Sequence, residues 1–423
     1  MKTTVAIAGL GSRGLDAYAG AIEQLPDRAQ ITAVADPDPE KRREAASRFG
    51  LPENRVFDSA EAMLAAGKLA DVLLVCTQDR QHVGHALPAL ELGYDILLEK
   101  PISPDPDQCR ALLEAARRTG RKVVVCHVLR YTPFYRKLKE ILDSGVLGRL
   151  YAIQGIENVA YWHQAHSFVR GNWRNSDTTS PMILQKCCHD MDLIVWLTGR
   201  RCRRVSSFGS LGHFTADNAP QGAARRCLDG CRARENCPYD AEKIYMTNPA
   251  TGVLHGHTGW PCNVLALHPT EQSIRTAIET GPYGRCVYFC DNNVVDHQAV
   301  NLEMDDGLTV SFTMCAFTAD SGRYAKFMGD HGSLVADLGR SVIEVWPFGG
   351  EKTVYDLNLE KARASGHAGG DQALIEDFLD YLEGREREGI TSLEASMESH
   401  FMALAAEESR LHGGAPVDLS AWR

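Results

Sequence analysis

Several features that mark other classes of protein are missing from this sequence of 423 residues. No stretch reaches about 18 consecutive apolar residues, so the sequence predicts no membrane span. No long block of like charge occurs and the formal net charge is −10, which argues against a nucleic-acid or anionic-membrane binder. Internal repeats and low-complexity tracts are also missing, so we expect ordinary globular domains, and the length suits two.

The sequence also lacks the patterns of a secreted protein. Its 13 cysteines are an odd number spread through apparent strands and helices, which is typical of reduced thiols rather than a disulfide framework. The apolar N-terminal run is cut early by Gly9 and Gly11, and no small-residue cleavage site follows it. We therefore expect a cytoplasmic protein.

The first 128 residues alternate apolar strands with helical segments. The strands read VAIAGL, ITAVAD, DVLLVCT, DILLEK and KVVVCHV, and one of the helical segments between them reads PEKRREAASRFG. Continuous apolar strands with intervening helices are typical of a parallel sheet covered on both faces. We predict an α/β domain with a doubly wound sheet of the Rossmann type over residues 1–128.

The pattern changes from residue 129 onwards. The segment AVNLEMDDGLTVSFTMCAF contains two strands joined by an Asp-Asp-Gly turn, and helical patterns close the chain over residues 371–412. We predict an α+β domain with a mostly antiparallel sheet over residues 129–423. Residues 212–265 show no clear period, and we expect an irregular, cysteine-rich insertion there.

A glycine motif follows the first strand and opens a helix. GLGSRG matches G-x-G-x-x-G at Gly9, Gly11 and Gly14, whose small size lets a pyrophosphate approach the helix N-terminus. Asp36 ends the second strand, where a carboxylate accepts from a ribose 2′-hydroxyl and repels a 2′-phosphate. The sequence therefore predicts a bound dinucleotide, NAD rather than NADP, although two arginines shortly after Asp36 would favour NADP.

Lys100 lies in the segment LLEKP, at the carboxyl end of a parallel strand, where such sheets bind ligands. Together with AGLGSRG, VADPDPEKR, TQDRQH and a later histidine-bearing helix, this segment resembles the Gfo/Idh/MocA oxidoreductase family over nearly the whole chain. The resemblance implies a C-terminal domain with a large open sheet, a sugar or cyclitol bound against the nicotinamide, and a homodimer or homotetramer. The residues expected at the cofactor are Gly9, Gly11, Ser12, Arg13, Gly14, Asp36, Thr77, His82, Glu99 and Lys100.

The segment LQKCCHDMDLIVW has the apolar pattern of one buried helix, yet it carries charges. His189 matches the family histidine, whereas Gln185 stands where the family usually has an aspartate. At helical spacing Gln185, His189 and Asp192 share one stripe, with Lys186 beside it. We expect Lys100, His189 and Lys186 to be catalytic, with the acid and base roles exchangeable. The alternative is a core histidine with the charges in solvent.

Other residues suit contacts with a sugar. AYWHQAHSFVRGNWRN combines aromatic and hydrogen-bonding side chains, which suits either sugar stacking or an aromatic-anchored loop. Arg130 and Tyr131 follow the last Rossmann strand. His367 lies in the segment SGHAGGD, which resembles a His-Gly-Gly segment seen in some family members. The expected substrate-binding residues are Arg130, Tyr131, His163, Trp173, Arg174, Gln185 and His367.

The segment CLDGCRARENCP places three cysteines in a polar setting. Close thiolates with room for a fourth ligand suit structural zinc in tetrahedral geometry. We predict a zinc site at Cys227, Cys231, Cys237 and Cys286, with Cys262, Cys290 and His257 as other candidates for the fourth ligand. An iron-sulfur cluster and unliganded thiols are the alternatives.

These observations favour an NAD-dependent oxidoreductase that acts on a secondary alcohol of a sugar, glycoside or cyclitol. A second interpretation is an NAD-dependent glycosidase of the same family, which oxidises a ring hydroxyl transiently, eliminates the aglycone and adds water. A third is a non-catalytic, nucleotide-dependent binding or regulatory protein. The predicted partners are small molecules, with neither nucleic acid nor membrane among them.

Overall fold

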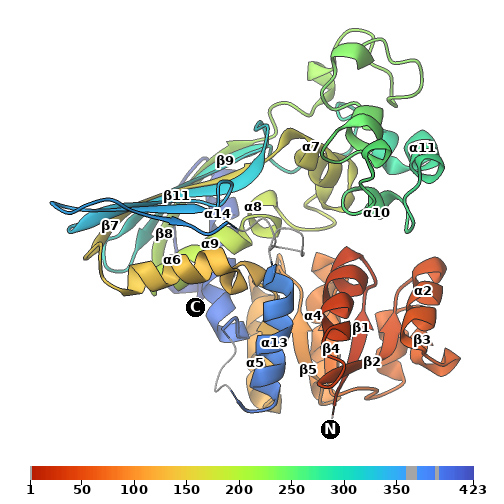
Figure 1. Cartoon of the computed structure of the whole chain (residues 1–423), viewed down its shortest axis with the longest axis horizontal. Helices are drawn as coiled ribbons and strands as arrows, with labels where there is room; N and C mark the ends of the chain where they lie inside the picture. The colour runs from red at the N-terminus through yellow and green to blue at the C-terminus, as the bar shows by residue number, and fades with distance from the viewer. Residues whose placement is uncertain (1, 359–368, 386–389) are drawn as a thin grey trace.

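The computed structural model describes residues 2–358, 369–385 and 390–423. Two sheets lie side by side in this part of the chain, and a smaller helical unit lies above the first of them (Figure 1). No helix of the described residues is both long and apolar enough to cross a membrane.

The first sheet has six parallel strands in the order β3-β2-β1-β4-β5-β6. All four residues of β4 are buried, which explains why these strands read as continuous apolar runs. The strand bounds are β1 Thr3–Ala8, β2 Ala29–Ala35, β3 Val56–Phe57, β4 Val72–Val75, β5 Asp95–Leu98 and β6 Val123–Val125.

Helices connect these strands, and their ends follow local capping rules. Asp38 and Asp105 accept from the backbone N–H two residues later, each is followed by proline, and Gly50 and Gly120 end the same two helices in the left-handed region. The helix bounds are α1 Ala19–Glu23, α2 Pro39–Phe49, α3 Ala60–Ala65, α4 His82–Glu91 and α5 Pro106–Thr119.

The second sheet has nine strands in the order β14-β13-β12-β11-β7-β10-β9-β8-β15. Among the described residues it is mostly antiparallel, and β7 and β10 form its one parallel pair. The predicted hairpin is present as β9 and β10. The bounds are β7 Leu150–Val159, β8 Cys202–Ser210, β9 His297–Met304, β10 Thr309–Cys315, β11 Ser321–Gly329, β12 Gly332–Asp337, β13 Val342–Pro347, β14 Thr353–Asp356 and β15 Val417–Asp418.

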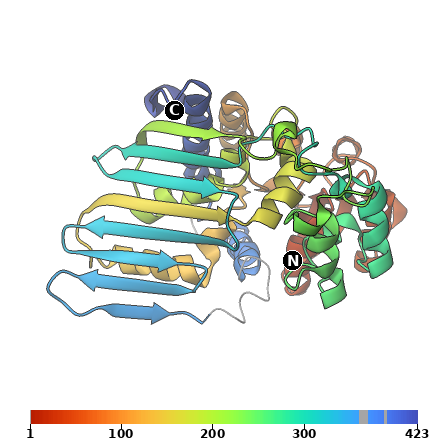
Figure 2. The ribbon, with the colours of Figure 1, turned by 90° about the horizontal axis from the view of Figure 1, so that it is seen from above.

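One face of this sheet is covered by helices and the other is open (Figures 1 and 2). Buried and exposed residues alternate along β9 and β10, as expected for strands covered on one side only. The helices of this layer are α6 Pro133–Asp143, α8 Met182–Gln185, α9 Cys188–Thr198 and α14 Leu393–Leu411.

The helix α13 (Gly370–Leu382) joins the first sheet although it lies late in the sequence. Its buried residues Leu374, Ile375, Phe378 and Leu379 share a core with strands β1 and β2. The chain therefore returns to the first sheet after β14, and it adds β15 to the second sheet only afterwards.

Between β8 and β9 the chain forms a helical unit with its own apolar core, which includes Phe214, Tyr245 and Ile274. The irregular segment that we predicted is thus packed, and it extends to α11 (Glu271–Thr280) after α10 (Cys262–Leu265). It packs on the short helix α7 (Tyr161–His163) and the π-helical turn η5 (Gln164–Arg170).

The burial of two histidines, His166 and His400, is expected to make the folded protein less stable in acid. Burial lowers the pKa of both His166 and His400 to about 3, from an ordinary value of about 6.5. Between these pH values the unfolded chain binds protons that the folded chain does not, so stability present above about pH 6.5 falls as the pH decreases.

We expect the free energy of unfolding, measured by urea titration, to fall between pH 6 and 4 by roughly 1.4 kcal/mol per pH unit for each histidine. His400→Gln, which keeps a donor for the Ser396 carbonyl and an acceptor for the Ile102 N–H, should remove about one such increment. Equal stability of the parent protein at pH 7 and pH 4 would contradict this account.

Candidate active site

The glycine loop after β1 is shaped for close approach of a ligand. A Cβ at Gly9, where φ is +95°, would lie 2.4 Å from the Cys76 carbonyl oxygen, and one at Gly14 would lie 2.0 Å from the Gly9 carbonyl oxygen. A Cβ at Gly11 would meet nothing within 4 Å. Two glycines therefore allow the tight turn, and the third leaves open space in which a pyrophosphate fits at the helix N-terminus.

Asp36 lies beside this loop at the end of β2. One carboxylate oxygen accepts from the Leu10 N–H at 2.7 Å and the other from the Asp38 N–H at 2.9 Å. Each oxygen keeps a further lone pair for a ribose hydroxyl. Arg42, one of the two arginines that would favour NADP, donates to the Asp36 backbone carbonyl at 2.6 Å. These residues fit a dinucleotide.

Arg13 of the glycine loop points inward, where it joins three elements. Its guanidinium pairs with Glu99 at 2.8 Å, after β5, and with Asp371 at 2.6 Å, in α13. Tyr18 also hydrogen-bonds to both Arg13 and Glu99. Burial raises the pKa of Glu99, but the charges of Arg13 and Lys100 outweigh it and the net shift is downward. The glycine loop, β5 and α13 are thus held together by a partly buried cluster of charges.

Lys100 follows Glu99 and reaches the second domain. Its ammonium donates to the Gln185 backbone carbonyl at 2.9 Å. Gln185 is the last residue of α8, and α9 starts at Cys188, so the one continuous helix that the sequence predicts is divided at this point. The Gln185 carbonyl, which in a continuous helix would accept the N–H of His189, instead accepts from Lys100.

His189 lies in the first turn of α9 and is 7% exposed. Its ring contacts the ring of His127 edge to face, at 5.6 Å between centroids. Burial lowers the pKa of His127, and the charges of Arg130 and Lys100 lower it further. A neutral imidazole therefore lies behind His189, on the side of β6.

Arg130 and Asp192 form a buried ion pair. Two Arg130 nitrogens donate to the two Asp192 oxygens at 2.7 and 2.6 Å, and a third donates to the Ile390 carbonyl at 2.9 Å. The Tyr131 hydroxyl likewise bonds Asp377 at 2.9 Å. Arg130 and Tyr131 are thus held by partners within the protein, and Asp192, 3.7 Å from His127, lies on the same side of α9 as His189.

Lys186 belongs to a cluster of four charges that the sequence analysis missed. Its ammonium lies 3.1 Å from a Glu157 oxygen on β7, and Arg323 on β11 pairs with both Glu157 and Asp190, at 3.0 and 2.8 Å. Two cations thereby balance two carboxylates, and burial raises the pKa of Asp190. The signal available in the sequence was weak, because Glu157 is the one charged residue of β7 but Arg323 shares β11 with Lys326.

His163 lies within electrostatic range of Lys100 and Lys186 and packs against two tryptophans. The pKa of His163 is lowered mainly by burial, and the charges of Lys186, His166 and Lys100 lower it further. The ring packs edge to face on Trp260 of the insertion, with 4.8 Å between centroids, and stacks on Trp162 at 5.8 Å. The structure therefore brings His163 together with the lysines, and it adds Trp260, which no sequence motif identified.

The remaining predicted residues have other surroundings. Trp173 donates to Asp79 at 3.3 Å, and Arg174 forms an exposed ion pair with Asp291 at 2.7 Å. His82 lies between the carbonyls of Thr77 and Pro101, which orders the segment after β5. Ser12 begins the π-helical turn that follows the glycine loop. His367 lies outside the described residues.

Comparison with known proteins agrees with this geometry. Residues 3–127 match a family model described as "Oxidoreductase family, NAD-binding Rossmann fold", and residues 139–419 match "Oxidoreductase family, C-terminal alpha/beta domain". The chain belongs to the Gfo/Idh/MocA family. The predicted family and fold class are confirmed, and this Gfo/Idh/MocA protein is an NAD-binding oxidoreductase by family.

Its relatives include a putative oxidoreductase, YteT, of Bacillus subtilis, 24% identical over 90% of this chain and 89% of the relative. An inositol 2-dehydrogenase of Corynebacterium glutamicum is 30% identical, over 47% of this chain and 54% of the relative. In fold, the protein is similar to an Agrobacterium radiobacter oxidoreductase solved with NAD+, L-tartaric acid and magnesium, with a TM-score of 0.70, 14% identity and complete coverage of both chains. The WlbA dehydrogenase of Bordetella pertussis, solved with NADH and UDP-GlcNAcA, gives a TM-score of 0.68 at 17% identity, with 99% of each chain covered.

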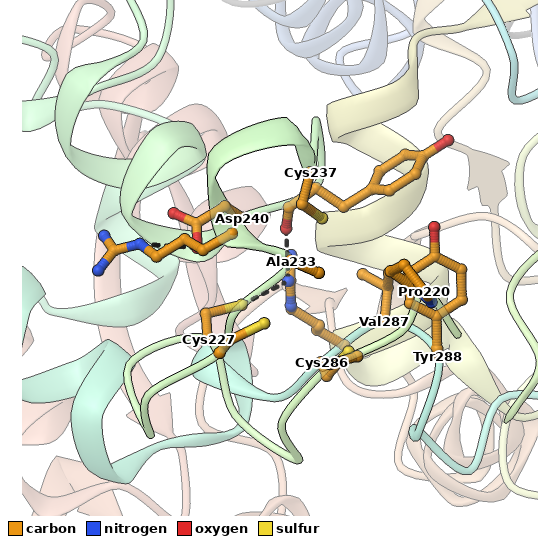
Figure 3. Close-up of a pocket in the computed structure, with 13 residues that line it drawn as sticks. Pro220, Cys227, Ala233, Cys237, Asp240, Cys286, Val287 and Tyr288 are labelled. Carbon is orange, nitrogen blue, oxygen red and sulfur yellow. Dashed lines mark hydrogen bonds and ion pairs between the residues drawn. The ribbon is translucent and has the colours of Figure 1, made fainter. Parts of the chain in front are cut away.

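The four cysteines predicted to bind zinc line one small cavity in the insertion of this family member (Figure 3). Cys227 and Cys286 are buried, whereas Cys231 and Cys237 are half-buried. Within the described ranges, however, no group of three or more His, Cys, Asp or Glu side chains is arranged to hold a metal ion. The ligand geometry thus gives the zinc prediction no support.

The Arg130–Asp192 pair gives a test of its structural role. Arg130→Met leaves a carboxylate buried without its charge partner and should lower the free energy of unfolding by roughly 3–5 kcal/mol. Arg130→Met/Asp192→Leu removes both charges and should recover most of that loss. Urea unfolding measures both effects. A raised KM with unchanged stability would instead place Arg130 at the substrate.

Proposed function

We propose that this protein transfers hydride between NAD and a secondary alcohol of a sugar, glycoside or cyclitol. The observation that carries the proposal is the Lys100 ammonium, held at 2.9 Å by the Gln185 carbonyl at the carboxyl end of β5. This end of a parallel sheet is where such folds bind ligands, and it also presents the glycine loop and Asp36.

The surrounding side chains suit a polyhydroxylated substrate. Trp162 and Trp260 offer apolar ring faces, and Trp260 is 41% exposed. His163, Lys186 and the Gln185 side chain offer polar groups around them. Apolar faces combined with a few placed hydrogen-bonding groups are typical of carbohydrate sites. Lys186, whose charge Glu157 balances, serves here as a hydrogen-bond donor that orders hydroxyls.

Each of the two central residues has a separate role. Bound NAD supplies the hydride acceptor. His189 takes the hydroxyl proton, because an imidazole has a basicity suited to general base work near neutral pH. Lys100 donates a charged hydrogen bond to the oxygen as negative charge develops there, and its contact with Gln185 fixes that donor before substrate arrives. The lowered pKa keeps His163 neutral, so its ring can accept a hydrogen bond from a neighbouring substrate hydroxyl.

The proposal is tested by incubating the purified protein with NAD and a panel of sugars, cyclitols and aryl glycosides. Net formation of NADH from a sugar or cyclitol would support it. Release of the aglycone without net NADH would support a glycosidase that works by transient oxidation. Binding of NAD and sugar with no turnover of any compound would support a non-catalytic binding protein.

Lys100→Met and His189→Gln should each lower turnover by roughly a hundredfold or more, because each removes a group that moves or stabilises charge in the transition state. NAD binding and the folded state should persist. Matched controls are Lys139→Met and His331→Gln, at surface positions outside the site. Near-normal activity of His189→Gln on the true substrate would make the histidine structural.

Asp36 should set the preference for NAD over NADP. Asp36→Ala removes a ribose acceptor and a charge that repels a 2′-phosphate, so the ratio of the two dissociation constants should narrow by roughly tenfold or more. Asp38→Ala, which removes only the cap of α2, should leave the ratio unchanged. Fluorescence titration with NAD and with NADP measures the two dissociation constants and hence their ratio. Equal binding of both by the parent protein would refute the assignment.

A further inference from the structure

One segment of the insertion, residues 260–268, reaches from the candidate active site to the first domain, above which the insertion lies (Figure 1). At its start Trp260 packs edge to face on His163, with 4.8 Å between ring centroids. Further along, the Asn263 amide donates to Asp16 at 2.9 Å. Asp16 belongs to the π-helical turn that follows the glycine loop. We call residues 260–268 the strap.

The far end of the strap also packs on the first domain. Leu267 lies against the apolar core that Leu15 and Ala45 help to form on one face of the first sheet. His268 lies 3.8 Å from Glu44 on α2, but both side chains are exposed and such a pair contributes little. The strap is therefore held on the first domain mainly by the hydrogen bond of its asparagine and the apolar contact of its leucine.

A second connection between the two domains lies on the opposite face of the first sheet. The Trp173 indole N–H donates to Asp79 at 3.3 Å, and Arg80 donates to the Ser176 carbonyl at 2.8 Å. Asp79 and Arg80 come just before α4, whose Val83 packs in the other core of this sheet. The strap and this connection thus flank the carboxyl end of the sheet on its two sides.

The glycine loop lies between the two connections. Gly9 lies against the Cys76 carbonyl just after β4, and the loop continues into the turn that carries Asp16. A dinucleotide on this loop is therefore flanked on both sides. Each connection also holds a buried oxygen without a hydrogen-bond partner among the described residues, Asn263 Oδ1 and Asp79 Oδ2. Buried acceptors normally have a donor, and a dinucleotide carries ribose hydroxyls and amino groups.

We propose that the insertion is part of the cofactor site, and that NAD enclosed between the strap and the Trp173–Asp79 connection is retained from one turnover to the next. The proposal rests on the NAD site of the proposed function but not on its substrate. The Asn263–Asp16 hydrogen bond and the Leu267 contact join protein to protein, so they hold the strap with or without NAD. Opening of the strap therefore limits the entry of NAD as well as its release.

The test measures exchange of the cofactor on the whole protein, without substrate. We expect nucleotide to stay with the protein through gel filtration and dialysis, and excess NAD to displace bound NADH, followed by its fluorescence, over minutes or longer. Normal binding with displacement during mixing would overturn the enclosure and leave the proposed function intact. A protein that binds no NAD would overturn both.

Two variants separate the strap from a direct contact with NAD. Leu267→Ala removes a contact within the protein only, so uptake and release of NADH should both become faster, by roughly tenfold or more, with little change in the dissociation constant. Asn263→Ala also removes a buried acceptor, so it should raise the dissociation constant as well.

Matched controls are Leu254→Ala and Asn236→Ala, at exposed positions of the same unit. Circular dichroism checks that every variant is folded. Unchanged rates in Leu267→Ala, faster release without faster uptake, or equal effects of the controls would contradict the strap.

Hydrogen exchange of the parent protein gives a second measurement that needs no variant. Loading nucleotide-free protein with NAD should slow the exchange of backbone amides in residues 260–268, because the strap opens less often over a bound cofactor. The control segment is β13, which lies in the second sheet and should exchange at the same rate in both samples. Equal exchange of residues 260–268 with and without NAD would overturn the proposal.

Discussion

The partly buried Arg13–Glu99 ion pair is the constraint on which the rest of the site depends. It joins the glycine loop to the residue before Lys100, and its second carboxylate, Asp371, brings in α13 from the end of the chain. Because the Glu99 side chain is fixed beneath the loop, successive side chains after β5 diverge, and Lys100 is directed towards Gln185 in the other domain. Cofactor loop and candidate catalytic lysine are thus positioned by one interaction.

Charge balance explains why the cleft tolerates so many buried ions. Lys186 and Arg323 are matched by two carboxylates, and Arg130 is matched by Asp192. Lys100 instead contacts a neutral carbonyl, so its charge stays available to a developing alkoxide. Arg170 does not follow this pattern, because it is buried beside a thiol rather than a carboxylate.

Much of the architecture could be predicted from local patterns. Apolar runs alternating with helical segments predicted the first sheet, and two strand patterns joined by an Asp-Asp-Gly turn predicted the β9–β10 hairpin, because these features depend on neighbours in sequence. The division between α8 and α9 could not be predicted, because it coincides with a contact to Lys100, 85 residues away. The Arg130–Asp192 pair and the place of Trp260 beside His163 could not be predicted for the same reason: the partners lie in segments distant in the sequence.

The central claim is that hydride passes directly between substrate carbon and NAD while His189 and Lys100 manage the proton and the charge. The most direct measurement is a single turnover with a substrate that carries deuterium on the oxidised carbinol carbon, followed by mass spectrometry of the cofactor. The account predicts one deuterium in each NADH formed and a slower reaction than with the protiated substrate. NADH without deuterium would contradict direct transfer, and with it the function proposed for this site.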